Sequence, residues 1–242
     1  VYSQLNFMKN KDKGFVSQGL VVVDNIGELK DHAETFRQMV DQQSAVVSTS
    51  LSNRIPAGNS VSMGTYEIPK TRKTISIQEF GADDKYLNTM GMQLLNGRNF
   101  EKGLQSDTNS LILNESAVAA LGLFHPVGTL INGSERVIGV VKDFNFASMH
   151  ERIAPAILRF KPTANRTLVI RLRGGNAAAF VGWLQTTGQK FSPGVRLSVT
   201  FPDDNFARLT RKERVLGNAI TFFTSLAIIL AVLGLIGLTL FT

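Results

Sequence analysis

Few residues in this chain could support bond-making or metal chemistry, and they are scattered along it. The chain has no cysteine, which excludes thiolate catalysis, disulfides and cysteine-ligated zinc. None of its three histidines, His32, His125 and His150, has a second histidine or a carboxylate at metal-ligand spacing on a clear common face. His32 is expected on a solvated helix face, and His150 with Glu151 suits general-base chemistry by spacing alone. We therefore predict no metal site and no histidine-based catalytic site.

The carboxylate pairs and the motif search lead to the same prediction. Asp83-Asp84 and Asp203-Asp204 stand where helices are expected to begin, and there a carboxylate complements the positive end of the helix dipole. No Gly-x-x-x-x-Gly-Lys-[Ser/Thr] phosphate loop occurs, so we predict that this chain does not itself hydrolyse ATP. The nearest match to a Gly-x-Ser-x-Gly nucleophile elbow, residues 58–62, lacks the last glycine. We predict no catalytic residue and no bound cofactor.

The basic residues are spread along the chain and do not form a nucleic-acid-binding arm. The formal net charge is +7, but no recognised nucleic-acid-binding module accompanies it. With 43% hydrophobic and 19% charged residues, the composition is that of a folded domain. Residues 1–214 are enough for one large or two small domains. We predict a folded protein that does not bind nucleic acid.

The last stretch of the chain has the composition of a membrane segment. After Arg214 no charged residue occurs, and residues 215–242 are apolar apart from Asn218 and several threonines and serines. About 20 apolar residues cross a hydrocarbon core about 30 Å thick, because a helix rises about 1.5 Å per residue. The alternative, a helix buried in a soluble protein, would show a polar stripe, and this stretch shows none. We predict a truncated transmembrane helix over residues 218–242, and we expect another membrane segment before Val1 in a longer protein.

Near the N-terminus the pattern predicts a β-α-β unit. Residues 20–23 form a continuous apolar run and residues 45–51 are rich in β-branched side chains, so both are expected to be strands. Asn25 and Glu28 have the spacing of a capping box at the start of the helix between them. One face of this helix is marked by apolar residues at i, i+4, i+7 and i+11: Leu29, Ala33, Phe36 and Val40.

A second β-α-β pattern follows later, after a region of short strands and turns. It comprises a strand at 168–172, a helix at about 176–190 and a strand at 195–201. In the region between the two units, Asn132-Gly133 separates two strand-like runs and predicts a β-hairpin. A short helix is expected from Asn114 or Glu115, closed by a glycine.

These elements predict the α+β class, with a membrane-proximal α/β subdomain of two β-α-β halves, split by an inserted β-rich subdomain and followed by a transmembrane helix. We assign residues 17–54 and 155–205 to the α/β subdomain and residues 55–154 to the insertion. Residues 1–16 and 206–217 are expected to be stalks that lead to the membrane.

Several short motifs occur in an order that resembles the extracytoplasmic core domain of MacB/FtsX-like ABC-transporter permeases, especially the variety common in Bacteroidetes. Each motif alone is weak, but the ordered set covers nearly the whole chain. The motifs lie at residues 4–15, 92–100, 113–117, 121–122, 126–128, 137–146, 211–217 and 233–238. One departure is Asn99, where the family often has aspartate, and we expect a turn to tolerate either residue similarly.

The resemblance implies a fold, a location and partners. The α/β subdomain would be the family's "porter" subdomain, and the chain would be the loop between the first and second of four permease helices, together with the second. The location would be the bacterial inner membrane, with the domain in the periplasm. The implied partners are a cytoplasmic ATP-binding subunit, a second permease copy or paired permease, membrane lipid, and a periplasmic adaptor or outer-membrane exit protein. The implied role is mechanical and non-catalytic.

The charges next to the predicted membrane helix bear on its orientation. Basic residues at 208–214 would favour the cytoplasm by the positive-inside rule, but domains of this length translocate largely regardless of charge. These residues would instead meet anionic lipid head groups.

The alternative function is an extracytoplasmic ligand-sensing domain of a membrane-bound signalling receptor, which would also be held between two membrane helices.

Overall fold

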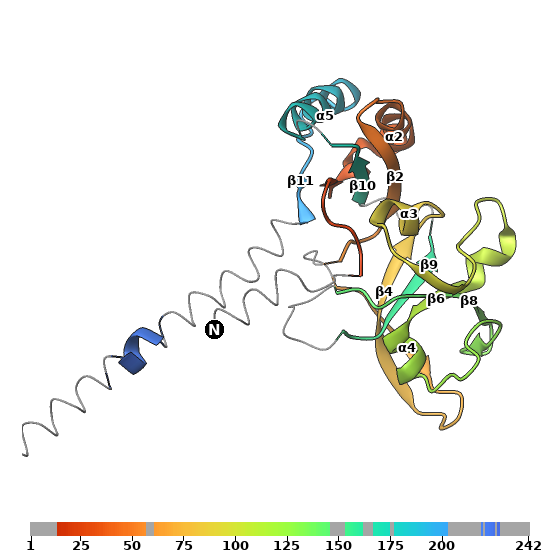
Figure 1. Ribbon diagram of the computed structural model, residues 1–242. Coiled ribbons are helices and arrows are strands. Elements are labelled where there is room, and N and C mark those ends of the chain that lie inside the picture. Colours follow the sequence, from red (N-terminus) through yellow and green to blue (C-terminus); the bar gives the residue numbers. More distant parts are fainter. Residues whose placement is uncertain are drawn as a thin grey trace, which may run out of the picture. The chain divides into compact units, whose positions relative to one another are not determined.

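The computed structural model describes residues 14–56, 61–145, 153–161, 167–174 and 177–202, together with 219, 221–225 and 227 (Figure 1). The chain divides into two units, Val1–Asp203 and Asp204–Thr242. The first contains an 11-stranded sheet with parallel and antiparallel pairs, so the predicted α+β class is confirmed.

One end of the sheet carries both predicted β-α-β patterns in an interleaved form. Strand β1 (Leu20–Val23) is antiparallel to β10 (Thr167–Leu172) and to β11 (Val199–Thr200), and β2 (Val46–Ser52) is antiparallel to β10. Strands β1 and β2 are therefore parallel with β10 between them, and β10 and β11 are parallel with β1 between them. The order β11-β1-β10-β2 is that of a split β-α-β fold.

The helices of this end pack on an apolar cluster that includes the predicted helix face. They are η1 (Ile26–His32), a 3-10 helix, and the α-helices α2 (Ala33–Asp41) and α5 (Ala177–Phe191). All four residues of the predicted face are buried in one cluster with strand residues such as Val21 and Ile170. Burial of each large apolar side chain contributes about 1.5–3 kcal/mol, so this cluster stabilises the packing of the helices on the sheet.

The predicted capping box is wrong. The side chain of Asn25 accepts no hydrogen bond from the helix. Its amide instead donates to the Arg196 carbonyl oxygen at 2.9 Å, and its carbonyl oxygen accepts from the Ser198 N–H at 2.6 Å. The backbone leading to β11 therefore satisfies both polar groups of this side chain. The helix is also interrupted at Lys30, which has φ 49° and ψ −125°.

The other end of the sheet has the order β4-β9-β6-β8-β5, with β3 on β4 and β7 on β8. Its elements are β3 (Met63–Glu67), β4 (Thr74–Ala82), β5 (Leu94–Gly97), η2 (Gln105–Asn109), β6 (Ser110–Asn114), α4 (Glu115–Ala120), β7 (Leu130–Ile131), β8 (Glu135–Val141) and β9 (Ala156–Phe160). Helix α3 (Tyr86–Met90) follows β4 but packs on β2 and β10. The predicted hairpin at Asn132-Gly133 is confirmed, with φ values of 49° and 77°. The predicted short helix is also confirmed as α4, and the structure shows that the Asn114 side chain caps it by accepting from the Ala117 N–H at 2.9 Å.

Strand β9 joins this end of the sheet although it follows a long insertion in the chain. It is parallel to β4 and antiparallel to β6. The sequence analysis grouped it with residues 155–205. The division of the first unit into two subdomains stays a prediction.

The two ends of the sheet meet at a narrow connection. Strands β2 and β4 pair through one residue pair, Ser52 with Ala82. The Asn53 N–H donates to the Gly81 carbonyl oxygen at 3.1 Å, and the Gly81 N–H donates to the Asn53 side chain at 2.7 Å. A second apolar cluster, which includes Tyr66, lies on the far side of this connection.

The predicted membrane helix falls on residues that are mostly outside the described ranges. Residues 219, 221–225 and 227 are helical. In the part of the chain that the structure describes, no helix has both the length and the apolar composition needed to cross a membrane. The predicted stalk at 206–217 and residues 1–13 of the first stalk also lie outside the described ranges.

Candidate functional site

The structure separates the residues whose types could support chemistry. His32 is exposed, with its ring centroid 5.8 Å from that of Phe191, and His125 is exposed in a loop. Among the described residues, no group of three or more histidines and carboxylates could hold a metal ion. His150, Glu151, Asp203, Asp204 and residues 58–60 lie outside the described ranges. Polar side chains such as Asp83 and Arg171 instead connect one element of the fold to another.

The lead-in segment, residues 14–19, is the described chain that enters β1. Its Val16 N–H donates to the Met90 carbonyl oxygen at 2.9 Å, at the end of α3. Its Gly19 carbonyl oxygen accepts from the Leu172 N–H at 2.8 Å, at the end of β10. The segment is therefore attached to β10 and to α3, the helix that packs on β2 and β10.

Arg171 of β10 joins the lead-in segment to α3 through one guanidinium. Its Nε donates to the Thr89 carbonyl oxygen at 2.7 Å, its Nη2 to the Val16 carbonyl oxygen at 2.7 Å, and its Nη1 to the Gln18 carbonyl oxygen at 3.2 Å. Burial lowers the pKa of Arg171. The planar fork of guanidinium donors suits three acceptors in fixed directions, and an ammonium group would not reproduce this geometry.

Two glycines allow the lead-in segment to approach its neighbours closely. Gly14 has φ +72°, and a Cβ at this position would collide with the carbonyl oxygen of Asp143, which follows β8. Gly91 has φ +64°, and a Cβ there would lie 2.9 Å from Cγ2 of Val16. Both positions combine left-handed backbone with tight contact, so any larger residue would be strained.

Asp83 connects β2 to the start of α3. Its carboxylate accepts from the Ser50 hydroxyl at 2.6 Å, the Leu51 N–H at 2.8 Å and the Lys85 N–H at 3.1 Å. Burial raises the pKa of Asp83, and the hydrogen bonds from Ser50 and Leu51 oppose that effect. The carboxylate stands just before a helix, as predicted, and it also links the two ends of the sheet.

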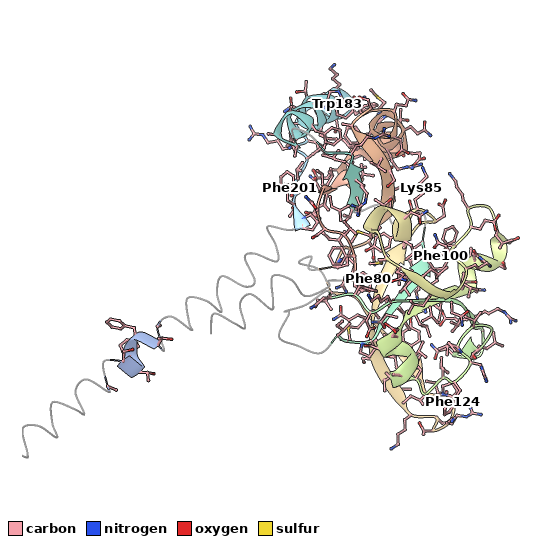
Figure 2. All side chains as sticks on the ribbon, viewed as in Figure 1. Phe80, Lys85, Phe100, Phe124, Trp183 and Phe201 are labelled. Atoms are coloured by element: carbon pink, nitrogen blue, oxygen red, sulfur yellow. The ribbon has the colours of Figure 1, made fainter. Side chains whose placement is uncertain are left out.

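A buried arginine, Arg54, which follows β2, contacts two residues of β4 at the same connection. The guanidinium carbon of Arg54 lies 4.2 Å from the ring centroid of Phe80, and its Nη2 donates to the Gln78 side chain at 3.0 Å. Phe80 in turn packs edge-on against Phe144, with ring centroids 5.5 Å apart; Figure 2 labels Phe80 in this region. Burial lowers the pKa of Arg54.

The motif at residues 97–100 is bonded to η2 and to Asp84, which precedes α3. Arg98 donates two hydrogen bonds, at 2.8 and 2.6 Å, to the fully buried carboxylate of Asp107. Asn99 donates from its side-chain amide to the Asp84 carbonyl oxygen at 2.7 Å and accepts from the Phe100 N–H at 2.8 Å. A carboxylate cannot donate to the Asp84 carbonyl, so we now expect aspartate at position 99 to be tolerated less well than the turn pattern predicts.

The sequence analysis did not single out Arg54 or Arg171. Arg171 had a signal, because it interrupts the otherwise apolar run from Leu168 to Leu172. A charge within a buried strand needs partners, but the pattern cannot say that they are carbonyl groups contributed by residues 16, 18 and 89.

Several solved structures share this fold, among them three transporter or permease domains. The periplasmic region of MacB from Actinobacillus actinomycetemcomitans is 15% identical with a TM-score of 0.57, and the match covers 86% of this chain and 97% of that one. The extracellular domain of the noncanonical ABC-type transporter YknZ from Gram-positive bacteria is 14% identical with a TM-score of 0.50, covering 69% and 87%. A domain of a putative permease protein from Porphyromonas gingivalis is 15% identical with a TM-score of 0.51, covering 77% and 92%.

At these identities the match concerns the fold. The suspected MacB-like periplasmic core fold is thereby confirmed. No family model and no curated protein matches the chain.

Proposed function

We propose that this chain is the extracytoplasmic domain of an ABC-transporter permease. It transmits an ATP-driven conformational change across a bacterial inner membrane, and it thereby exports a substrate or drives a periplasmic partner. The fold shared with MacB and YknZ supports the general kind of function. In this proposal the domain is non-catalytic and lies in the periplasm.

The proposal includes the parts that the sequence predicted. Residues 218–242 are the membrane helix, residues 1–16 and 206–217 are the stalks, and the body comprises a porter-like subdomain with an inserted β-rich subdomain. ATP is hydrolysed by a separate cytoplasmic subunit or domain, and two permease copies or a permease pair assemble around it.

The observation that carries the mechanical part is the attachment of the lead-in segment. Force that arrives from the predicted N-terminal stalk must pass through residues 14–19. There Arg171 holds two carbonyl oxygens of the segment and one of α3 on a single planar group. A displacement of the segment would therefore move β10 and α3 together and would not be absorbed by a loose linker.

The test uses the full-length permease with its ATP-binding subunit in lipid nanodiscs. This chain has no cysteine, so a cysteine introduced at exposed Lys190 gives one attachment point in this domain for an environment-sensitive dye. We expect ATP to change the dye signal in the parent protein. Arg171→Ala should reduce that change several-fold while ATP hydrolysis continues, because the side-chain link between the lead-in segment and β10, the strand that precedes α5, would be lost.

The matched control is Arg173→Ala, which removes an exposed arginine two positions along the chain. It should keep both the signal and hydrolysis. An Arg171→Ala protein with a full ATP-driven signal would contradict the proposed force path. Failure of any ATP-binding subunit to associate with the parent protein would contradict the permease assignment and favour the sensor alternative.

A further inference from the structure

A surface at the far end of the β-rich half combines exposed apolar and basic side chains. We call it the tip surface, and it comprises Phe124, Val127, Leu130, Lys70, Arg72 and Arg136. Phe124 is 81% exposed, an unusual state for a side chain of this size. Figure 2 labels Phe124 at this end of the molecule, well separated from Trp183 on α5.

Independent contacts hold the parts of the tip surface together. The ammonium nitrogen of Lys70 lies 4.2 Å from the ring centroid of Phe124, so the β3–β4 turn meets the loop after α4. Asn132 donates to the Thr65 carbonyl oxygen at 3.2 Å and accepts from the Glu67 N–H at 3.0 Å, so the β7–β8 turn meets β3. These contacts bring three separate parts of the chain to one surface.

The backbone beneath the tip surface is closed by hydrogen bonds. In the β3–β4 turn, the Ile68 N–H donates to Lys73 at 2.8 Å, and the Ile68 carbonyl oxygen accepts from Thr71 and Arg72 at 3.1 and 3.0 Å. Below the loop, Leu123 packs on the apolar cluster around Tyr66. The surface is thus preorganised, which lowers the entropy lost on binding.

The charges of the tip surface favour an acidic partner. In the described ranges 61–75 and 121–136 the basic side chains are Lys70, Lys73, Arg72 and Arg136, and the acidic ones are Glu67 and Glu135. Glu135 is largely buried and paired with Arg159 at 2.5 Å. Glu67, 3.4 Å from Arg72, is therefore the one substantially exposed carboxylate of these ranges, against four exposed cations.

We propose that the tip surface docks an extracytoplasmic protein whose contact face carries carboxylates around an apolar pocket. An aromatic anchor with adjacent cations is the composition of interface hot spots, and the pocket would receive Phe124. A membrane fits this surface less well, because its three apolar side chains, of which only Phe124 is more than half exposed, are a weaker anchor than a single acyl chain. The proposal rests on the proposed function only in placing the partner outside the cytoplasm.

The test starts in intact host cells that make the full-length permease. A photo-reactive amino acid replaces Phe124 in one strain and Val47, a 53% exposed residue of β2, in the control strain. Irradiation should link one protein to position 124 and not to position 47. That protein is then identified, purified and titrated against the full-length permease in detergent at two salt concentrations.

We expect Phe124→Ala and Lys70→Glu each to raise the Kd at least about tenfold, and binding to weaken as salt increases. Val47→Ala and Lys190→Glu, also on exposed positions, should change the Kd less than about twofold. All four variants should melt within about 4 °C of the parent, because the replaced side chains lie on the surface and the lost Lys70–Phe124 contact is exposed.

Three results of the cross-linking and binding experiments would overturn the docking proposal. They are adducts with lipid alone, equal adducts at positions 124 and 47, and a captured protein that binds Phe124→Ala as tightly as the parent. Binding of the parent to vesicles of anionic lipid that is lost in Phe124→Ala would assign the surface to the membrane and also overturn it. Association with the ATP-binding subunit, measured on the same samples, tests the proposed function separately.

Discussion

Replacing Asn99 by aspartate should destabilise the protein, although the two residues differ by one polar group. The amide of Asn99 donates to the Asp84 carbonyl oxygen at 2.7 Å. In Asn99→Asp an ionised carboxylate oxygen would face that carbonyl at a similar distance, so an attractive contact would become repulsive. The bond accepted from the Phe100 N–H would remain.

The magnitude follows from the loss of one part-buried hydrogen bond and the acceptor left without its donor. Leaving a buried polar group unsatisfied costs about 1–3 kcal/mol. For a protein of this size, about 1 kcal/mol corresponds to about 2–4 °C in Tm. We therefore expect Asn99→Asp to lower the Tm by about 2–12 °C at pH 7.

The pH dependence gives the sharper check. Protonation of the introduced carboxyl restores a donor toward the Asp84 carbonyl, so the deficit in Tm should shrink as the pH falls from 7 toward 4. Thermal unfolding followed by circular dichroism at several pH values measures this. A deficit that is absent at pH 7, or that grows on acidification relative to the parent, would refute the reasoning.

The matched control is Asn132→Asp. Asn132 also donates from its amide, to the Thr65 carbonyl oxygen at 3.2 Å, but this bond is exposed to solvent. Water can replace the lost donor there, so we expect a change below about 1 kcal/mol. Equal effects at positions 99 and 132 would show that burial does not decide the outcome.

Three further predictions concern the same region. Asp107→Asn should lower the unfolding free energy at pH 7 and progressively less in acid, which denaturant unfolding at pH 7 and pH 3 measures. The reason is that the hydrogen bond from Arg98 lowers the pKa of Asp107, so the ionised carboxylate stabilises the fold at pH values above the ordinary pKa of aspartate, and this contribution is lost as the pH falls through the lowered pKa. Arg171→Ala should lower the unfolding free energy by about 2 kcal/mol and increase hydrogen exchange at the Val16 amide, with Arg171→Lys restoring less than half; an unchanged Val16 exchange rate would contradict this. Gly14→Ala should also increase hydrogen exchange at the Val16 amide, because φ is positive there and the added Cβ would collide with the Asp143 carbonyl oxygen. The control Gly103→Ala should affect only its own turn, because no atom lies within 4 Å of a Cβ at that position, although φ is +93°.

Local patterns predicted those elements whose signals depend on near neighbours in the chain. The apolar spacing from Leu29 to Val40 places four residues on one face of a helix, and all four are buried. The Asn132-Gly133 pair needs only its own backbone to form the hairpin turn. The helix expected from Asn114 or Glu115 begins at Glu115, and the Asn114 side chain caps it with a bond to a residue three positions along the chain.

Predictions failed where a distant segment supplied the partner. Asn25 has the spacing of a capping residue, but the backbone at residues 196 and 198 takes up its side chain. Asn99 fits an ordinary turn, and that pattern does not reveal the bond from its amide to the carbonyl of residue 84. In both cases the partner lies outside the local pattern, and proximity in space decided it.

The sequence by itself determined the α+β class, the buried faces of the strands and helices, and the absence of cysteine chemistry, because these depend on composition and on periods of two and 3.6 residues. Only the tertiary structure decided that the β-α-β patterns interleave, that β9 inserts between β4 and β6, and that Arg171 joins the lead-in segment to α3. The physical reason is that hydrogen-bond donors and strand edges are satisfied by whichever acceptor the packed chain brings near. Sequence separation carries no information about that distance.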